Sequence, residues 1–179
     1  MHPIVVNYNI RLEPLHLSVT ETIFRAIDKD REYLKKWLPF VNQTLEISDT
    51  ELFIQSVINQ PDKKKDEIFC IWYKEEFAGL IGFKDIDWNN RKTELGYWLS
   101  EKLQGKGIMT ACVQKLLRYA FKKLKMNRVQ IKVALGNDKS AAIPKRLGFQ
   151  FEGIERAGEF HQGSFLDLEV YSLLKGEYL

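Results

Sequence analysis

Residues 103–111 of the chain read LQGKGIMTA. They stand between an extended run, residues 94–100 (ELGYWLS), and an apolar-periodic run that continues to about Lys125. The apolar residues of that second run form one stripe at 3.6-residue spacing, which predicts an amphipathic helix. They are Val113, Leu116, Leu117, Ala120, Phe121 and Leu124. Two glycines therefore lie between a strand and the clearest helix of the chain.

This glycine loop is suited to binding an anion. The start of a helix leaves about four backbone N–H groups without helical partners and carries a partial positive charge. Gly105 and Gly107 have no side chains, so a ligand can approach their backbone closely. Thr110 adds a hydroxyl and Lys106 adds charge at the rim. These features predict a phosphate site, in particular for a pyrophosphate.

A glycine pair before a helix is more often only a tight turn. Two competing phosphate motifs are excluded: G-x-x-x-x-G-K-[ST] does not occur, and Thr110 stands where the third glycine of G-x-G-x-x-G belongs. The loop also follows the last strand of a meander and not the first strand of a parallel unit. A nicotinamide site is therefore disfavoured.

The segments around the loop define the fold class. Upstream, residues 67–73, 77–84 and 94–100 read as an antiparallel meander. Downstream, Val129, Ile131, Val133 and Leu135 alternate along a strand with one covered face, which a right-handed crossover places parallel to residues 94–100.

The other elements complete a single domain over residues 1–179. We expect an α/β (α+β) fold, in which a mixed, mostly antiparallel sheet of about seven strands is flanked by helices. The remaining predicted elements are a strand at 10–14, a helix from Val19 to Leu38 stopped by Pro39, a helix after Ser48 or Asp49, a helix from Lys139 to Leu147 closed by Gly148, and strands at 149–153 and 165–174.

Composition and charge exclude several classes. The chain is 45% hydrophobic and 28% charged, which is ordinary for a globular protein. Its net charge is only +3, and its lysines and arginines are scattered among acidic residues, which argues against nucleic-acid binding. No apolar run approaches ~20 residues, so we expect no membrane span, and the N-terminus lacks a signal-peptide pattern. Isolated Cys70 and Cys112 fit a reducing cytoplasm, and three separated histidines give no zinc spacing.

Three motifs resemble those of the Gcn5-related N-acetyltransferase (GNAT) superfamily. Residues 104–109 (QGKGIM) match its acyl-CoA loop, Q/R-x-x-G-x-G/A, except that Met109 replaces Gly or Ala. Residues 136–149 resemble its next motif, an Asn followed by a short helix ending in L-G-F. Residues 90–99 (NRKTELGYWL), with 105–110 (GKGIMT), look most like the branch that acetylates N-terminal serine or alanine of ribosomal proteins.

The resemblance implies acetyl transfer from acetyl-CoA to an amine in a ternary complex, with no metal. The pantetheine arm would pair with residues 98–100 beside a splayed sheet, an N–H near Leu99 would hold the thioester oxygen, and Asn137 would bond the arm. The Met109 amide can still bind phosphate if its side chain points into the core. The implied cofactor-binding residues are Trp98, Leu99, Ser100, Gln104, Gly105, Lys106, Gly107, Ile108, Met109, Thr110, Asn137 and Ser140.

Several residues are candidates for the chemistry. Many relatives have a tyrosine acid where this chain has Pro144, so Ser140 is the candidate for protonating the thiolate. The alternative for Ser140 is a helix cap, and the alternative for Asn137 is a turn residue. Glu159 is the preferred base for the amine and Glu94 the second choice, and each has the alternative of a structural carboxylate. Trp37 is the candidate wall of the acceptor pocket, or else core.

Three functions remain open at this point. The first is an acetyltransferase for protein N-terminal α-amines, of the ribosomal-protein type. The second is an acetyltransferase for a small amine, because the same CoA half serves both. The third is a non-catalytic acyl-CoA-binding module, which Pro144 leaves open. A homo-oligomer formed by pairing of the final strand or the meander edge also remains open.

Overall fold

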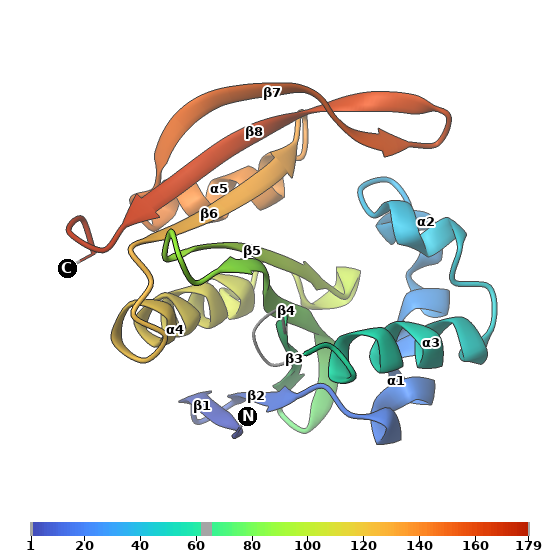
Figure 1. Ribbon diagram of the computed structural model, residues 1–179. Coiled ribbons are helices and arrows are strands. Elements are labelled where there is room, and N and C mark those ends of the chain that lie inside the picture. The colour runs from blue at the N-terminus through green and yellow to red at the C-terminus, as the bar shows by residue number, and fades with distance from the viewer. Residues whose placement is uncertain (1, 62–65, 179) are drawn as a thin grey trace.

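A computed structural model describes residues 2–61 and 66–178 of the chain. Its centre is an eight-stranded sheet in the order β1-β2-β3-β4-β5-β6-β8-β7, with helices on both faces (Figure 1). All neighbouring strands are antiparallel except β5 and β6, which are parallel. The strands are β1 (Ile4–Asn7), β2 (Ile10–Pro14), β3 (Glu67–Tyr73), β4 (Glu76–Asp87), β5 (Lys92–Leu99), β6 (Arg128–Ala134), β7 (Gln150–His161) and β8 (Ser164–Leu174). The expected mixed, mostly antiparallel fold is confirmed.

The helices bury two apolar clusters on opposite faces of the sheet. Helix α4 (Ile108–Lys122) covers one face with its predicted stripe, and Val113, Leu116 and Phe121 lie in that core. Helices α1 (Thr20–Lys29) and α3 (Ile47–Ile58) cover the other face, where Ile23, Ile54 and Trp98 pack together. Helix α5 (Asp138–Arg146) lies against β6, β7 and β8. Strand β5 thus contributes residues to both clusters.

The parallel pair separates early, and this separation positions the site. Strands β5 and β6 pair only from Lys92–Arg128 to Glu94–Gln130, although β5 continues to Leu99 and β6 to Ala134. The sheet therefore opens beyond Glu94, as the resemblance implies. The second half of β5 presents a free edge to the gap.

The predicted helix from Val19 to Leu38 is wrong in its continuity. It is divided at Asp30 into α1 and the short α2 (Arg31–Leu34), after which the chain reaches a 3-10 turn at Pro39–Asn42. The cause is long-range: the Arg31 guanidinium donates to the carbonyls of Val41 and Thr44 at 2.8 Å each. These bonds hold α2 against the following loop.

Other boundaries also differ from the predictions. Helix α3 begins at Ile47, before Ser48, because Glu46 and Asp49 form a reciprocal capping box in which Asp49 is the third residue of the helix. Leu135 was expected on the covered face of a strand, but β6 ends at Ala134 and Leu135 is 56% exposed. Gly148 adopts the predicted left-handed conformation, with φ of 78°.

The final strand cannot pair between subunits as the sequence suggested. Strand β8 lies between β6 and β7 and is hydrogen-bonded to both. The β7–β8 hairpin arches from the sheet towards α2 (Figure 1), and Gln162 at its turn donates to the Lys35 carbonyl at 2.8 Å. The hairpin thus closes one side of the molecule over the gap beside β5.

Candidate active site

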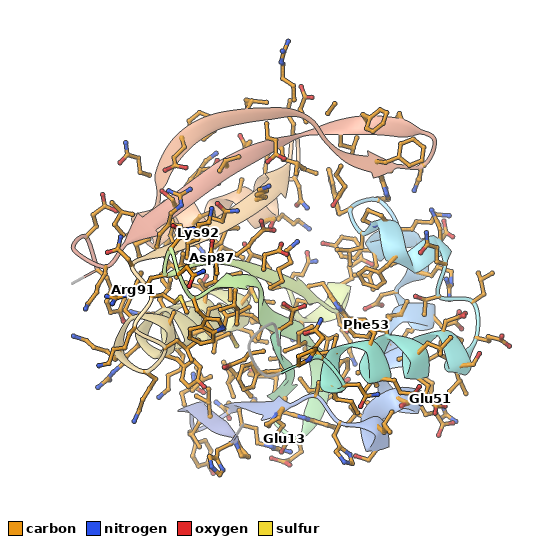
Figure 2. All side chains as sticks on the ribbon, viewed as in Figure 1. Glu13, Glu51, Phe53, Asp87, Arg91 and Lys92 are labelled. Carbon is orange, nitrogen blue, oxygen red and sulfur yellow. The ribbon has the colours of Figure 1, made fainter. Side chains whose placement is uncertain are left out.

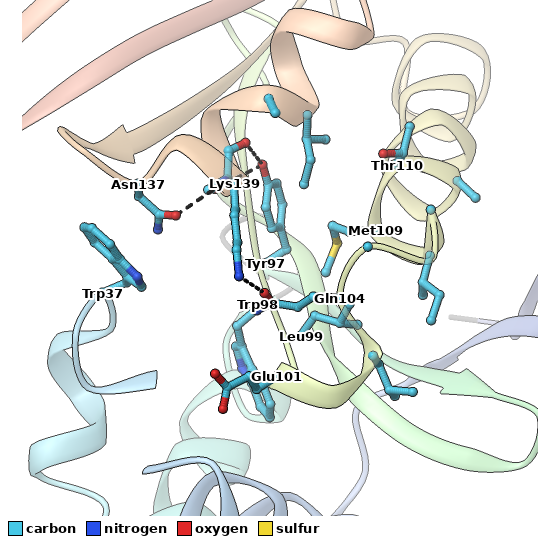
Figure 3. A pocket seen from close by; sticks show the side chains of 18 of the residues that line it. Trp37, Tyr97, Trp98, Leu99, Glu101, Gln104, Met109, Thr110, Asn137 and Lys139 are labelled. Atoms are coloured by element: carbon cyan, nitrogen blue, oxygen red, sulfur yellow. Dashed lines mark hydrogen bonds between the residues drawn. The ribbon is translucent and has the colours of Figure 1, made fainter. Parts of the chain in front are cut away.

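A cleft of about 920 Å³ lies where β5 and β6 separate. Its floor is the second half of β5, one wall is the start of α4 and the other is α5, while α2 closes an end (Figure 3). Eleven of the residues predicted from sequence line it together: Trp37, Trp98, Leu99, Gln104, Gly105, Gly107, Ile108, Met109, Thr110, Asn137 and Ser140. Segments more than a hundred residues apart in sequence therefore meet in one cavity.

The glycine loop has the geometry of an anion cradle. Gly105 and Gly107 adopt left-handed conformations with φ of 72° and 73°, and a Cβ added at either would meet no atom within 4 Å. Gly107 is the N-cap of α4 and offers no side-chain hydrogen bond to the first turn. The Met109 side chain is buried in the core, so it does not block the cleft in front of the Met109 amide. The first-turn amides are thus directed at the cavity.

Two cations that the sequence reading overlooked lie on the opposite wall. Lys139 and Arg146 of α5 both line the cleft. Lys139 Nζ is 3.0 Å from Gln104 Oε1, and Arg146 Nη1 donates to Thr110 Oγ1 at 2.9 Å. Their spacing of seven places them on one face of α5, which is the signal that could have identified them. The cleft therefore combines helix-terminal amides with two positive side chains.

The free edge of β5 offers a main-chain donor. The Ser100 amide donates to the Ala78 carbonyl of β4 at 2.8 Å, so it is already satisfied. Successive N–H groups of a strand point to opposite edges, and the Leu99 N–H therefore points into the gap towards β6. Two of the predicted cofactor-binding residues do not line the cleft: Ser100, which is buried, and Lys106, which is exposed to solvent.

Ser140 has a tyrosine partner that the sequence reading missed. Asn137 caps α5 by accepting from the Ser140 amide at 3.3 Å, while Ser140 Oγ donates to Tyr97 Oη at 3.4 Å (Figure 3). Burial raises the pKa of Tyr97 to about 12, so its phenol stays protonated. Tyr97 and Ser140 are 43 residues apart in sequence, and only the fold brings them together.

A second pocket of about 610 Å³ adjoins the cleft, and the two share Trp37, Leu38, Tyr97 and Trp98. Glu159 of β7 lines this second pocket. Burial raises the pKa of Glu159, while the charges of Lys84 and His161 lower it and Glu94 raises it again. A half-buried carboxylate beside the shared wall can accept a proton from an amine that meets the thioester there.

Glu94, the other candidate base, is held elsewhere. It is 7% exposed, its Oε1 is 2.8 Å from Lys84 Nζ, and its Oε2 accepts from Gln130 Nε2 at 3.0 Å. Both of its oxygens are therefore engaged, and Glu94 lines neither of the two pockets. Of the two carboxylates, the structure brings Glu159 to the pocket.

Neither cysteine is suited to act as a nucleophile. Cys70 and Cys112 are free and buried, and burial raises the pKa of each thiol to about 12. Within residues 2–61 and 66–178, no group of three His, Cys, Asp or Glu side chains is arranged to hold a metal ion. Among the described helices, none is both long and apolar enough to cross a membrane.

Comparison with known proteins places this site in context. The model of the acetyltransferase (GNAT) domain family matches residues 9–150. The chain is 36% identical to the putative ribosomal N-acetyltransferase YdaF of Bacillus subtilis (strain 168), over 97% of this chain and 95% of that protein.

Two solved structures are similar over nearly the whole chain. One is RimL, a ribosomal L7/L12 alpha-N-protein acetyltransferase in complex with coenzyme A, with a TM-score of 0.91, 25% identity, and coverage of 96% of this chain and 97% of that one. The other is the microcin C7 self-immunity acetyltransferase MccE in complex with acetyl-CoA and AMP, with a TM-score of 0.89, 32% identity, and 94% of each chain covered.

Proposed function

The chain belongs to the acetyltransferase (GNAT) domain family and is an acetyl-CoA-dependent N-acetyltransferase, and we propose that its acceptor is the N-terminal α-amine of a protein, of the ribosomal-protein type. The observation that carries the proposal is the pair of adjoining cavities. We assign the cleft of about 920 Å³ to the cofactor and the second pocket, of about 610 Å³, to the acceptor, and call them the cofactor cleft and the acceptor pocket. They share the wall made by Trp37, Tyr97 and Trp98, and Glu159 lines the acceptor pocket.

In this proposal the glycine loop and the first turn of α4 bind the diphosphate of acetyl-CoA. Lys139 and Arg146 add charge from the opposite wall, and the pantetheine arm runs along the free edge of β5. The Leu99 N–H is directed at the thioester oxygen, where it stabilises the oxyanion that forms on attack. One such donor contributes about 3 kcal/mol to transition-state stabilisation.

The amine attacks the thioester directly. The amine nitrogen bonds to the thioester carbon and Glu159 takes one proton from that nitrogen. The carbon–sulfur bond then breaks, and coenzyme A leaves as a thiolate to which Ser140 donates a hydrogen bond. The buried cysteines, with their pKa values of about 12, support direct attack and not an acetyl-enzyme intermediate. Free thiols also support action in the cytoplasm.

The entrance of the acceptor pocket favours a polypeptide. Phe40, Leu52 and Phe53 line the pocket and are partly exposed at 38%, 63% and 38% (Phe53 is labelled in Figure 2). Such an apolar rim can pack against the residues that follow an N-terminal amine. The similarity to YdaF, a putative ribosomal N-acetyltransferase, and to RimL, a ribosomal L7/L12 alpha-N-protein acetyltransferase, supports the same class.

The test is mass spectrometry of protein N-termini from cells with and without the gene. The proposal predicts that a small set of ribosomal-protein N-termini loses acetylation when the gene is deleted. If every N-terminus stays unchanged while the purified protein acetylates small amines, the acceptor is a small molecule. The solved structure of MccE contains the small molecule AMP as well as acetyl-CoA, so a small-molecule acceptor is the main alternative to a protein N-terminus.

Ser140→Ala is expected to lower kcat about 10- to 100-fold and to leave the KM for acetyl-CoA nearly unchanged. The lost hydrogen bond acts on a charged sulfur, where such bonds contribute roughly 1.5–3 kcal/mol. Tyr97→Phe, which removes only the partner of Ser140, should give a smaller loss in kcat. Steady-state kinetics with a peptide acceptor measure both values, and an unchanged kcat in Ser140→Ala would remove Ser140 from the chemistry; the helix-capping alternative is already excluded, because Asn137 caps α5.

A further inference from the structure

An ion pair between β4 and β5 adjoins the acceptor pocket, and only its carboxylate is buried. Lys84 of β4 reaches Glu94 of β5, with 2.8 Å between Nζ and Oε1. The lysine side chain is 52% exposed, while that of the carboxylate is only 9% exposed. Because Gln130 donates to the second oxygen of Glu94, the carboxylate is fixed in place. Glu94 can therefore hold the lysine in one position.

The lysine stem crosses β5 towards the pocket. A Cβ added at Gly96 would lie 3.7 Å from the Lys84 Cε, so the lysine stem runs beside Gly96 of β5. Lys84, Gly96 and Glu159 all line the acceptor pocket. Lys84 and Glu159 thus line the same pocket, and Glu94 holds the lysine ammonium group.

The other charged groups around Glu159 are engaged or lie farther out. Asp49 of α3 lines the pocket, but its Oδ2 accepts from the amides of Leu45 and Glu46 at 2.8 and 2.9 Å. Of the described residues that line this pocket, Lys84 is the single lysine or arginine.

Three further groups border this arrangement. Lys132 of β6 pairs with Glu155 of β7 at 2.7 Å and is 3.9 Å from Glu94. His161 lies buried two residues beyond Glu159 on β7, and Asp85 follows Lys84 on β4. Lys84 therefore contacts one carboxylate, Glu94, and shares the pocket with a second, Glu159.

We propose that Lys84 and Glu94 are positioning residues for the acceptor site: Lys84 keeps Glu159 in its charged, proton-accepting form, and Glu94 anchors the lysine and offsets part of its charge. The inference rests on the proposed role of Glu159. Lys84 transfers no proton; the amine N–H bond breaks and the new O–H bond forms on Glu159. The pair sets the pH at which that carboxylate is ready to accept.

The two residues act on Glu159 in opposite directions. Removing the positive charge of Lys84 disfavours the carboxylate, whereas removing the negative charge of Glu94 favours it and releases the lysine towards the pocket. If activity needs charged Glu159, it decreases as the pH falls and Glu159 becomes protonated; this decrease is the acidic limb of the pH profile. The acidic limb should move to higher pH in Lys84→Met and to lower pH in Glu94→Gln.

The experiment measures kcat/KM against pH for a synthetic peptide with a free N-terminal serine at saturating acetyl-CoA. We expect the acidic limb to shift upwards by about one pH unit in Lys84→Met and downwards by roughly half a unit in Glu94→Gln. Lys92→Met is the matched control, because it removes an exposed lysine from the end of β5 beside Asp87 (Figure 2) and should leave the limb in place. Damage to the fold alone would lower kcat without opposite shifts.

A second readout does not depend on activity. The ¹³C signal of the Glu159 carboxyl, assigned by its loss in Glu159→Gln, reports its titration in the unliganded full chain. Opposite shifts in the two variants support the charge effect of the pair on Glu159, while the activity of Glu159→Gln tests separately whether Glu159 is the base. Shifts in the same direction, no shifts, or a loss in Glu94→Gln equal to that in Glu159→Gln at every pH would overturn the inference.

Discussion

Glu159→Gln is expected to lower kcat/KM for the peptide acceptor by about 10²- to 10³-fold at neutral pH, which is the usual contribution of a positioned general base. Glutamine keeps the size and polarity of the side chain but cannot accept the amine proton. Burial raises the pKa of Glu159, so the wild-type activity should fall at a higher pH than an exposed glutamate would give. In the variant the limb due to this carboxylate should be absent.

The matched control is Glu155→Gln, four residues earlier on β7. Glu155 pairs with Lys132 at 2.7 Å and lies outside the acceptor pocket, so its substitution should change kcat/KM only slightly. Full activity of Glu159→Gln across the pH range would remove Glu159 from the mechanism. Loss of activity in both variants alike would indicate general damage to the hairpin.

Gly105→Asp is expected to weaken coenzyme A binding by roughly 100-fold relative to Gly105→Asn, because a carboxylate in the cradle repels the diphosphate. Both residues tolerate the left-handed conformation of Gly105, whose φ is 72°, and a Cβ there meets no atom within 4 Å. The two side chains have nearly the same shape. The difference between them therefore reports the charge alone.

Calorimetry at low and high salt measures this difference. Salt screens the repulsion, so the ratio of the two Kd values should shrink as ionic strength rises. An aspartate near the start of α4 interacts favourably with the helix dipole, so the variant should remain folded. Equal affinities for the two variants would place the diphosphate away from the loop.

Local patterns predict most of the fold. The helical stripe from Val113 to Phe121, the meander and the crossover appear in the structure because each depends on the spacing of neighbouring residues, although α4 ends at Lys122, before Leu124. Strand β1 was not predicted, since it has four residues and no fully buried side chain. Strand β7 runs to His161, beyond the predicted strand at 149–153, and its pairing with β8 is irregular between Glu155 and Glu159.

The site is only partly predictable for a different reason. The glycine loop is continuous in sequence, so its cradle can be recognised from residues 104–110 alone. The contacts of Tyr97 with Ser140 and of Lys84 with Glu94 join separate strands and helices, and their register is set by packing. No local pattern marks Tyr97 as a partner of Ser140 or separates Glu94 from Glu159 as the base.

The most direct test of the account is a ¹⁵N NMR titration of the full chain with coenzyme A, and in parallel with 3′-phospho-ADP and with pantetheine. The account predicts that the amides of Gly105, Gly107, Ile108, Met109 and Thr110 shift most with coenzyme A and with 3′-phospho-ADP, and little with pantetheine. If these amides stay unmoved while coenzyme A binds, the diphosphate is not held at the start of α4, and the assignment of the cleft is contradicted.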